Sequence, residues 1–181
     1  MYTKNHADRV RYGNNIWKES NMRQWLNSSG NDWFRKQNEY DVRSGSTGYS
    51  SGWMTGFVPG FLDLVMPVYN KTVRNTVSTI TGGGGGGYDI TLDRFWLLSL
   101  KEFNGNNVNN IAEGKQLAYF RDVATTNNQR IQYDEGGVAR HVWLRSPYEY
   151  NANYEYHIYT SGASNYYNAN NAYAFQPAMC I

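Results

Sequence analysis

The sequence predicts an α+β fold with two short helices and a largely antiparallel sheet. Three observations predict this class: short apolar segments of strand length, two segments with helical spacing or helix-start residues, and polar or glycine-rich stretches between them. A chain of 181 residues can bury a core of its own. Because no repeat or linker divides the sequence, we interpret residues 1–181 as a single domain.

The first helix is expected around Trp25. Met22, Trp25 and Leu26 recur at helical spacing and would lie on one face. The Ser-Asn pair at 20–21 can cap its start, and the Asn-Ser-Ser-Gly stretch at 27–30 ends it. We therefore expect a short amphipathic helix that packs on a sheet through Trp25.

The second helix is expected in an apolar patch that follows a Ser/Gly-rich loop. Pro59 suits the first helical position, and Pro67 would stop a helix that runs through Leu64. Residues 68–80 then alternate loosely and predict one or two strands. The glycine run at 82–87 is interpreted as a flexible surface loop between strands, because the Gly-Lys-Ser/Thr sequence of a phosphate-binding loop does not follow it.

Apolar segments in the second half of the chain predict further strands. In residues 141–147, Val142 and Leu144 would face one way from a central strand that Pro147 ends. Residues 134–137 are expected to form a turn. The remaining strand candidates are residues 93–99, 118–120, 130–133 and the apolar C-terminal segment 174–181, which is expected in the core.

The charge balance limits the classes of partner. The 17 basic and 15 acidic residues give a net charge of +2, which argues against nucleic acid or an anionic membrane as the main partner. No apolar window is long enough for a membrane-spanning helix, and the first residues lack the apolar stretch of a signal peptide. The single cysteine, Cys180, excludes an internal disulfide framework and a multi-cysteine metal site.

The most distinctive part of the chain is the Tyr/Asn-rich segment of residues 148–173. No Lys or Arg occurs after Arg145. Three interpretations are open: a low-complexity tract, a packed strand with alternating faces, and an exposed recognition surface. We favour the recognition surface, because tyrosine supplies a rigid amphipathic ring at low entropic cost and asparagine supplies adaptable hydrogen bonds.

The expected ligand contacts are the tyrosines, asparagines and one histidine of this segment. Their rings would stack on sugar faces or fill apolar pockets. The backbone beneath them would be held by Trp143, Leu144, Phe175 and Met179. The contact residues are Tyr148, Tyr150, Asn151, Asn153, Tyr154, Tyr156, His157, Tyr159, Tyr166, Tyr167, Asn168, Asn170, Asn171 and Tyr173.

The composition of this segment also matches a codon pattern. Asparagine is encoded by AAY, and substitution of only the adenines yields residues such as Tyr, His, Asp, Ser or Thr, but never Lys, Glu, Trp, Met or Gln. Residues 148–173 are almost entirely Asn, Tyr, His and Ser around fixed-looking Ala, Ile and Gly. The segment therefore resembles a stretch of AAY codons randomised at adenine.

The whole chain resembles the variable proteins of diversity-generating retroelements, which gut bacteriophages and prophages carry. The glycine run is longer than this resemblance leads us to expect. The matching motifs are Tyr-Gly-Asn-Asn-Ile-Trp at 12–17, Met-Arg-Gln-Trp-Leu-Asn-Ser at 22–28, Arg-Phe-Trp-Leu-Leu-Ser at 94–99, Arg-Ile-Gln-Tyr at 130–133, Trp-Leu-Arg-Ser-Pro at 143–147 and Gln-Pro-Ala-Met-Cys-Ile at 176–181.

This resemblance implies a C-type-lectin-like fold of the formylglycine-generating-enzyme-like subclass, in which two short helices flank twisted antiparallel sheets. The variable region, about 148–173, would line one exposed face. It also implies a host-recognition protein at a phage tail tip or on a bacterial cell surface, with a protein or glycan receptor as its partner. The chain would then be the C-terminal domain of a larger protein, and a homo-oligomer stays open.

Other classes of function fit the sequence less well. An oxidase of the formylglycine-generating kind uses paired cysteines, and the histidines here are scattered without a nucleophile and base beside them. A calcium lectin would need EPN-like or WND-like signatures with clustered carboxylates, which are missing. A structural virion or oligomerisation domain with no small-molecule ligand stays open as the alternative. We therefore expect no enzyme activity, no catalytic residue, no metal and no cofactor.

Overall fold

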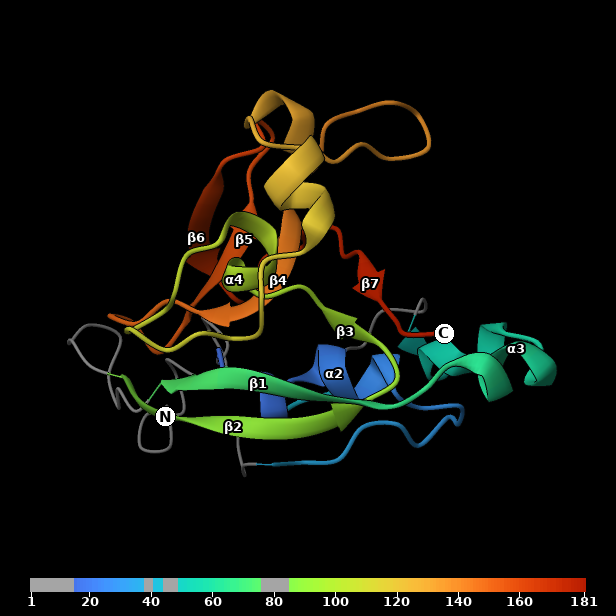
Figure 1. Cartoon of the computed structure of the whole chain (residues 1–181). Helices are drawn as coiled ribbons and strands as arrows, with labels where there is room; N and C mark the ends of the chain where they lie inside the picture. Colours follow the sequence, from blue (N-terminus) through green and yellow to red (C-terminus); the bar gives the residue numbers. More distant parts are fainter. Residues whose placement is uncertain (1–14, 38–40, 44–48, 76–84) are drawn as a thin grey trace.

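The computed structural model of the chain describes residues 15–37, 41–43, 49–75 and 85–181. It has an α+β fold of short helices and small antiparallel sheets, as the sequence predicts. Figure 1 shows a two-stranded hairpin with a short helix beside it, and a three-stranded sheet that stands above this layer. No helix in these ranges is both long and apolar enough to cross a membrane.

The lower layer is built on an antiparallel hairpin that packs against the N-terminal helical elements (Figure 1). The buried carboxylate of Asp93 accepts hydrogen bonds from Trp17 Nε1 at 3.3 Å and from Arg23 Nε at 2.7 Å. This charge-assisted contact ties the helix to the hairpin. The elements of the layer are η1 (Trp17–Glu19), α2 (Asn21–Leu26), β1 (Val68–Asn75) and β2 (Gly85–Asp93).

The upper layer is an antiparallel sheet in the order β4-β5-β6. The strand predicted at residues 141–147 is confirmed as β4, but the prediction that it is central is wrong, because β5 lies between β4 and β6. The other side of β4 is bonded to irregular segments: Trp143 N donates to Ala174 O at 3.0 Å, and Arg145 N donates to Leu98 O at 2.9 Å. The strands are β4 (Val142–Pro147), β5 (Tyr154–Ile158) and β6 (Ser164–Asn168).

Short elements connect the two layers and flank them. The strands β3 (Trp96–Leu97) and β7 (Pro177–Ala178) form a small antiparallel pair between the layers (Figure 1). The helical elements are η3 (Trp53–Gly56), α3 (Pro59–Leu64), α4 (Leu100–Asn104), the π-helical turn η4 (Tyr119–Val123) and η5 (Asn128–Arg130).

Two hydrophobic clusters hold the layers together. One joins α2 to β3 and β4 through buried tryptophans that include Trp25, Trp96 and Trp143. The other packs Phe103 of α4 against the β4 and β5 side chains, Ile158 among them. Burial of each large apolar side chain stabilises the fold by about 1.5–3 kcal/mol. Trp143 belongs to the first cluster and Leu144 to the second, so the two clusters hold β4 from both faces of the upper sheet.

Both predicted helices are confirmed. Ser20 caps α2, since its side chain accepts a hydrogen bond from Arg23 N at 3.0 Å. Pro59 occupies the start of α3. Trp25 is buried in the cluster that contains Trp96 of β3 and Trp143 of β4, and its ring also meets Trp53 at 5.2 Å and Phe175 at 5.3 Å.

The expectation of only two helices is wrong, because the described residues also contain α4. A capping box starts this helix: Ser99 Oγ accepts from Glu102 N at 3.1 Å, and the Glu102 carboxylate accepts from Ser99 N at 2.9 Å. Gly105 ends it in the left-handed region, at a φ of 85°.

Several predicted strands are wrong or shorter than expected. Residues 118–120 lead into a π-helical turn, and residues 130–133 contain the end of a 3-10 turn and one isolated bridge. Of residues 93–99, only Trp96–Leu97 pair as a separate strand. Segments this short carry too little periodicity to separate helix from strand. The turn at 134–137 is confirmed, with Gly137 N donating to Asp134 O at 2.9 Å.

The glycine run and the C-terminal segment also differ from expectation. The strand predicted at 68–80 is confirmed as β1 up to Asn75, and residues 76–84 lie outside the described ranges. Residues 85–87 open β2 instead of forming a loop. At the C-terminus only β7 is a strand. Phe175, Ala178 and Cys180 pack against the core as expected, whereas Met179 and Ile181 are exposed.

Candidate ligand-binding face

The strand β4 is the scaffold of the site, and buried polar groups fix it in place. Arg145 donates to the Glu102 carboxylate at 2.6 and 2.9 Å. Ser146 donates to the buried Glu113, whose other oxygen accepts from Val73 N at 2.7 Å. Burial raises the pKa of Glu113. These bonds join β4 to α4 and to β1.

The turn between β4 and β5 is anchored by two buried asparagines from other parts of the chain. Asn15 Nδ2 donates to the carbonyls of Asn151 at 2.8 Å and Tyr154 at 2.6 Å. Asn75 Nδ2 donates to the carbonyls of Tyr148 at 2.8 Å and Asn151 at 2.9 Å. The backbone that carries the predicted contact tyrosines is therefore held by bonds that leave their side chains free to point elsewhere.

The register of β5 and β6 divides the aromatic side chains between two faces of the sheet. On one face Tyr156 lies opposite Tyr166, and Tyr154 lies opposite Asn168. His157 points to the other face, because successive strand side chains alternate. The Tyr/Asn-rich segment thus forms two aromatic groups rather than a single surface.

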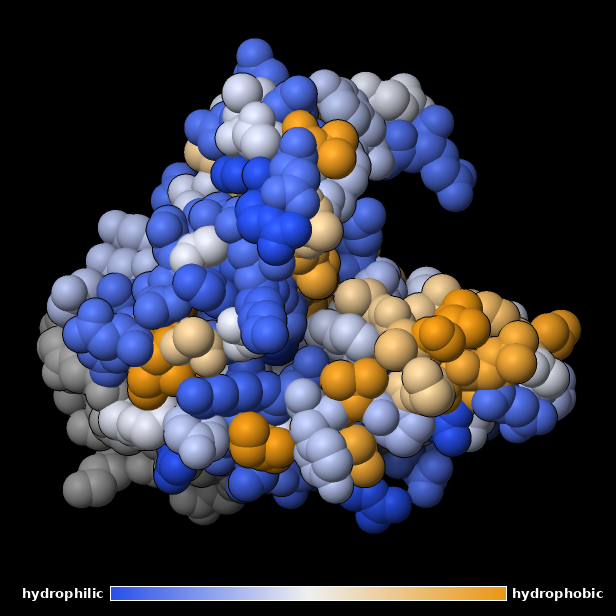
Figure 2. All heavy atoms as spheres, in the orientation of Figure 1, coloured by the Kyte–Doolittle hydropathy of each residue, from blue (hydrophilic) through white to orange (hydrophobic). Residues whose placement is uncertain are grey.

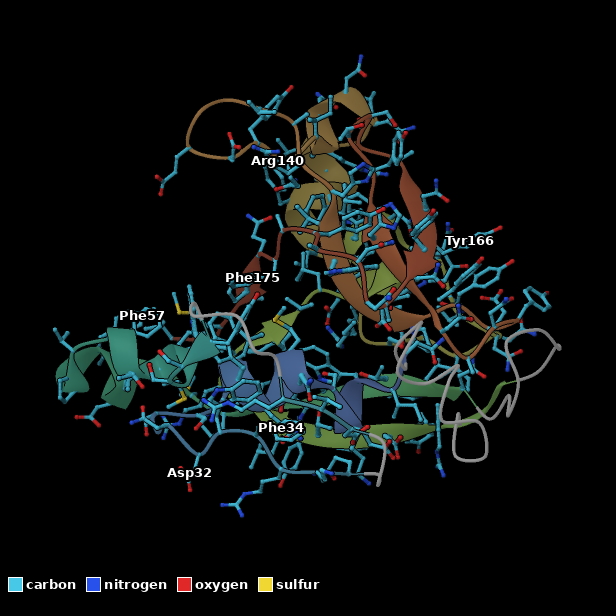
Figure 3. All side chains as sticks on the ribbon, turned by 180° about the vertical axis from the view of Figure 1, so that it is seen from behind. Asp32, Phe34, Phe57, Arg140, Tyr166 and Phe175 are labelled. Carbon is cyan, nitrogen blue, oxygen red and sulfur yellow. The ribbon has the colours of Figure 1, made fainter. Side chains whose placement is uncertain are left out.

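The first group, the tyrosine patch, comprises Tyr148, Tyr150, Tyr154, Tyr156 and Tyr166. Tyr148 and Tyr166 stack with ring centroids 3.7 Å apart and planes at 15°. The centroids of Tyr150, Tyr156 and Tyr154 lie 5.4, 5.7 and 6.1 Å from that of Tyr148. In Figure 3 Tyr166 lies at the outer side of the upper sheet.

The second group, the histidine cluster, comprises His141, Trp143, His157, Tyr159 and Tyr173. His141 stacks on Tyr173 at 4.6 Å and meets Tyr159 edge-on at 4.6 Å. His157 lies 5.2 Å from His141 and 5.6 Å from Trp143. Neither ring nitrogen of His157 has a hydrogen-bond partner among the described residues.

The predicted contact residues differ widely in exposure. Tyr150, Tyr159, Tyr166 and Tyr167 are 52%, 41%, 37% and 50% exposed. Asn170 is also exposed. The half-buried residues are Tyr148, Asn151, Tyr154, Tyr156, Asn168, Asn171 and Tyr173.

Two of the predicted contact residues, Asn153 and His157, are corrected to framework residues, because each is 1% exposed. Asn153 Nδ2 bonds to Asn168 Oδ1, and its carbonyl accepts from Ala169 N at 2.8 Å, so Asn153 closes the end of the β5-β6 pair. Trp143 and Leu144 are buried beneath the face as expected, whereas the exposed Met179 gives no such support.

The electrostatic environment keeps the aromatic groups neutral. Hydrogen bonding with Tyr166, together with burial and the charge of Glu149, raises the pKa of Tyr148 to about 12. Burial raises the pKa of Tyr156, and Glu149 raises it further. Burial lowers the pKa of His157 to about 4. At neutral pH the phenols therefore remain donors, and His157 is uncharged.

The arrangement supplies ring faces and amides rather than metal ligands. Within the described ranges, no group of three or more His, Cys, Asp or Glu side chains is placed to hold a metal ion. The chemistry that this face can perform is stacking on its rings and hydrogen bonding to its phenols and amides.

The sequence did not reveal that Asn15 and Asn75 belong to the site. Asn15 lies within the 12–17 motif, which is a weak signal, and Asn75 lies in a strand with no distinguishing pattern. Their role depends on contacts with residues more than seventy positions away, such as the bond from Asn75 to Tyr148. Only the three-dimensional arrangement could reveal it.

Comparison with known proteins places the chain in a family. Residues 2–181 match the family described as a domain of unknown function, DUF6273. The chain belongs to this family. The match covers nearly the whole chain, so the tyrosine patch, the histidine cluster and both anchoring asparagines lie within the DUF6273 domain. No curated protein and no solved structure matches the chain.

Proposed function

We propose that this DUF6273 domain is a ligand-binding module and that the tyrosine patch is its contact surface, together with Tyr167, whose ring centroid lies 6.4 Å from that of Tyr154. One observation carries the proposal: the exposed Tyr150 lies on a backbone turn that the buried Asn15 and Asn75 hold in place, and the exposed Tyr166 stacks on Tyr148 of the same turn. Binding surfaces of antibody type use the same combination of a fixed scaffold and exposed tyrosine and amide groups. The proposed activity is binding rather than catalysis.

We further propose that the chain is a variable protein of a diversity-generating retroelement, with a C-type-lectin-like fold. Its variable region would be about 148–173. The composition of this segment supports the proposal, because Tyr, Asn, His and Ser all arise from AAY codons by changes at adenine. The receptor would be a protein or glycan on a bacterial cell surface, recognised from a phage tail tip or from a neighbouring cell.

A binding screen tests the proposal. The full chain is applied to arrays of bacterial surface glycans and proteins, alongside a variant in which Tyr150, Tyr166 and Tyr167 are all replaced by Ala. We expect a ligand that binds the wild type and is lost by the variant. The matched control replaces three exposed tyrosines outside the segment by Ala and should bind normally: Tyr69, Tyr88 and Tyr133.

A genomic observation tests the retroelement proposal separately. The coding region for residues 148–173 should have a near-copy that differs only at adenines, close to a reverse transcriptase gene. A copy that differs at other bases, or the lack of any copy in the complete genome, would contradict this proposal and leave the binding proposal intact.

An assembly role is the second candidate, and one observation favours it. Figure 2 shows an apolar lobe around α3, where Val58, Leu64 and Met66 are 71%, 58% and 52% exposed. Exposed apolar patches of this kind mark interaction surfaces. Light scattering of the wild type and of Leu64→Asp tests the role: an oligomer that Leu64→Asp dissociates supports it, and a monomer in both samples contradicts it.

A further inference from the structure

Glu149 is the charged group of the tyrosine patch. Its carboxylate accepts a hydrogen bond from the Tyr156 phenol at 3.2 Å. Among the described residues no ion pair involves Glu149, and no Lys or Arg lies over a ring of the patch. The other carboxyl group of the segment belongs to Glu155, and burial raises its pKa well above the usual range. Glu155 also alternates with Tyr154 and Tyr156 along β5 and points to the other face, so Glu149 is the carboxyl group that contacts the patch.

The rings around Glu149 present electron-rich faces. Tyr148 and Tyr166 stack at 3.7 Å, and the half-exposed Tyr150 stands beside them. An aromatic ring face attracts a cation that lies within about 6 Å of its centre, and a neighbouring carboxylate adds to this attraction. No Lys or Arg follows Arg145 in the sequence, so the segment supplies no basic side chain for an anion. Charge and ring geometry both favour a positive ligand group.

We propose that the tyrosine patch binds an Arg or Lys side chain on the surface of a protein partner. This inference rests on the proposed ligand-binding function and specifies its partner. The cationic group would lie over a tyrosine ring and donate a hydrogen bond to Glu149, which combines a cation–π contact with a charge-assisted hydrogen bond.

The edge of β6 is a less suitable docking place for the partner. Among the described strands β6 pairs only with β5, so its other edge lacks a strand partner. However, Tyr166 N already donates to Asn165 Oδ1 at 2.9 Å, and Asn168 O already accepts from Asn171 N at 3.0 Å. Addition of a peptide strand needs such backbone groups to be available. Contacts through side chains over the patch are therefore favoured.

The test selects binders to the full chain from a library of displayed random peptides, with counter-selection on the Tyr150, Tyr166 and Tyr167 to Ala variant. We expect the selected peptides to be enriched in Arg and Lys. A synthetic copy with citrulline in place of Arg should bind about tenfold more weakly. Glu149→Gln should weaken the Arg peptide about tenfold and leave the citrulline peptide unchanged. The matched control is Glu135→Gln, an exposed carboxylate in the 134–137 turn, which should change neither.

The outcomes separate this inference from the proposed function. Peptides that require the tyrosines but lack Arg and Lys, or that bind equally well with citrulline, would overturn the cationic partner and leave the binding module in place. If every peptide that binds the wild type is removed by the counter-selection on the triple tyrosine variant, both the cationic partner and the binding module are overturned. Glu149→Gln keeps the size of the side chain at a partly exposed position, and its thermal unfolding shows directly that it folds.

Discussion

The tyrosine patch and the histidine cluster come from the same Tyr/Asn-rich segment, but solvent reaches them to very different degrees. In the patch, half of the Tyr150 side chain is exposed, whereas in the cluster His157 is almost completely buried. Alternation along β5 causes this difference, because Tyr156 and His157 point to opposite faces of the sheet. A composition suited to binding therefore also builds part of the support beneath the binding surface.

The comparison also shows where the rigidity of the patch comes from. The patch tyrosines contact mainly one another, whereas their backbone is fixed by Asn15 and Asn75. The segment can therefore exchange the exposed side chains without losing the bonds that hold the turn. Substitutions in the anchors, in the histidine cluster and in the patch should have separable effects.

The largest effect is expected for Asn15→Ala. This change removes the side-chain donor to the carbonyls of Tyr148, Asn151 and Tyr154, and with roughly 1 kcal/mol lost for each hydrogen bond the free energy of unfolding should fall by about 3 kcal/mol. Urea unfolding followed by tryptophan fluorescence measures it. The control Asn165→Ala removes an exposed amide and should change stability by less than about 1 kcal/mol. Equal effects of the two substitutions would contradict the anchoring role.

A smaller effect, which depends on pH, is expected at His157. Its folded pKa of about 4 is below its unfolded value, so the unfolded chain binds more protons between these two pH values. The stability that His157 contributes is complete above about pH 6.5 and falls by about 2–3 kcal/mol as the pH drops to 4. Urea unfolding of the wild type and of His157→Phe at pH 7 and pH 4.5 measures this loss.

The variant His157→Phe should lose less stability on acidification than the wild type does. Comparison of the two proteins cancels the contributions of Glu113 and Glu155, whose raised carboxyl pKa values act in the opposite direction. At pH 7 the variant should match the wild type, because both His157 nitrogens are unpaired. Identical acid sensitivity in the two proteins would show that His157 is not buried in an uncharged state.

The smallest effect is expected for Tyr156→Phe. The substitution removes the hydrogen bond to Glu149 and retains the ring, so stability should change by about 1 kcal/mol or less. A double-mutant cycle with Glu149→Gln measures the coupling between the two side chains. A coupling energy of zero would place the Glu149 carboxylate away from the phenol.

The parts of the fold that the sequence could predict carry local signals. Ser20 and Pro59 mark the starts of α2 and α3, and the alternation ended by Pro147 marks β4. The start of helix α4 could also be predicted from the sequence, because Ser99 and Glu102 have the spacing of a capping box. The conformation of residues 118–120 could not be predicted from the sequence, since an apolar run of this length is compatible with a strand or a helical turn.

The candidate site could be located from the sequence but not divided into its parts. The density of Tyr and Asn in residues 148–173 indicated a contact surface. The same density hides the difference between Asn153, which is buried, and Asn170, which is exposed. This difference depends on where β5 begins and on which side chain closes the β5-β6 pair, and both are consequences of contacts between distant residues.

The stability of the variant with Tyr150, Tyr166 and Tyr167 replaced by Ala tests most directly whether these rings form a surface on an independent scaffold. Urea unfolding of the variant beside the wild type gives the difference in free energy. We predict a loss of less than about 2 kcal/mol, since the three rings are exposed and their ring contacts are with other tyrosines of the segment rather than with the core. A loss above about 4 kcal/mol, as buried aromatic residues give on truncation, would contradict the account and make these tyrosines part of the core.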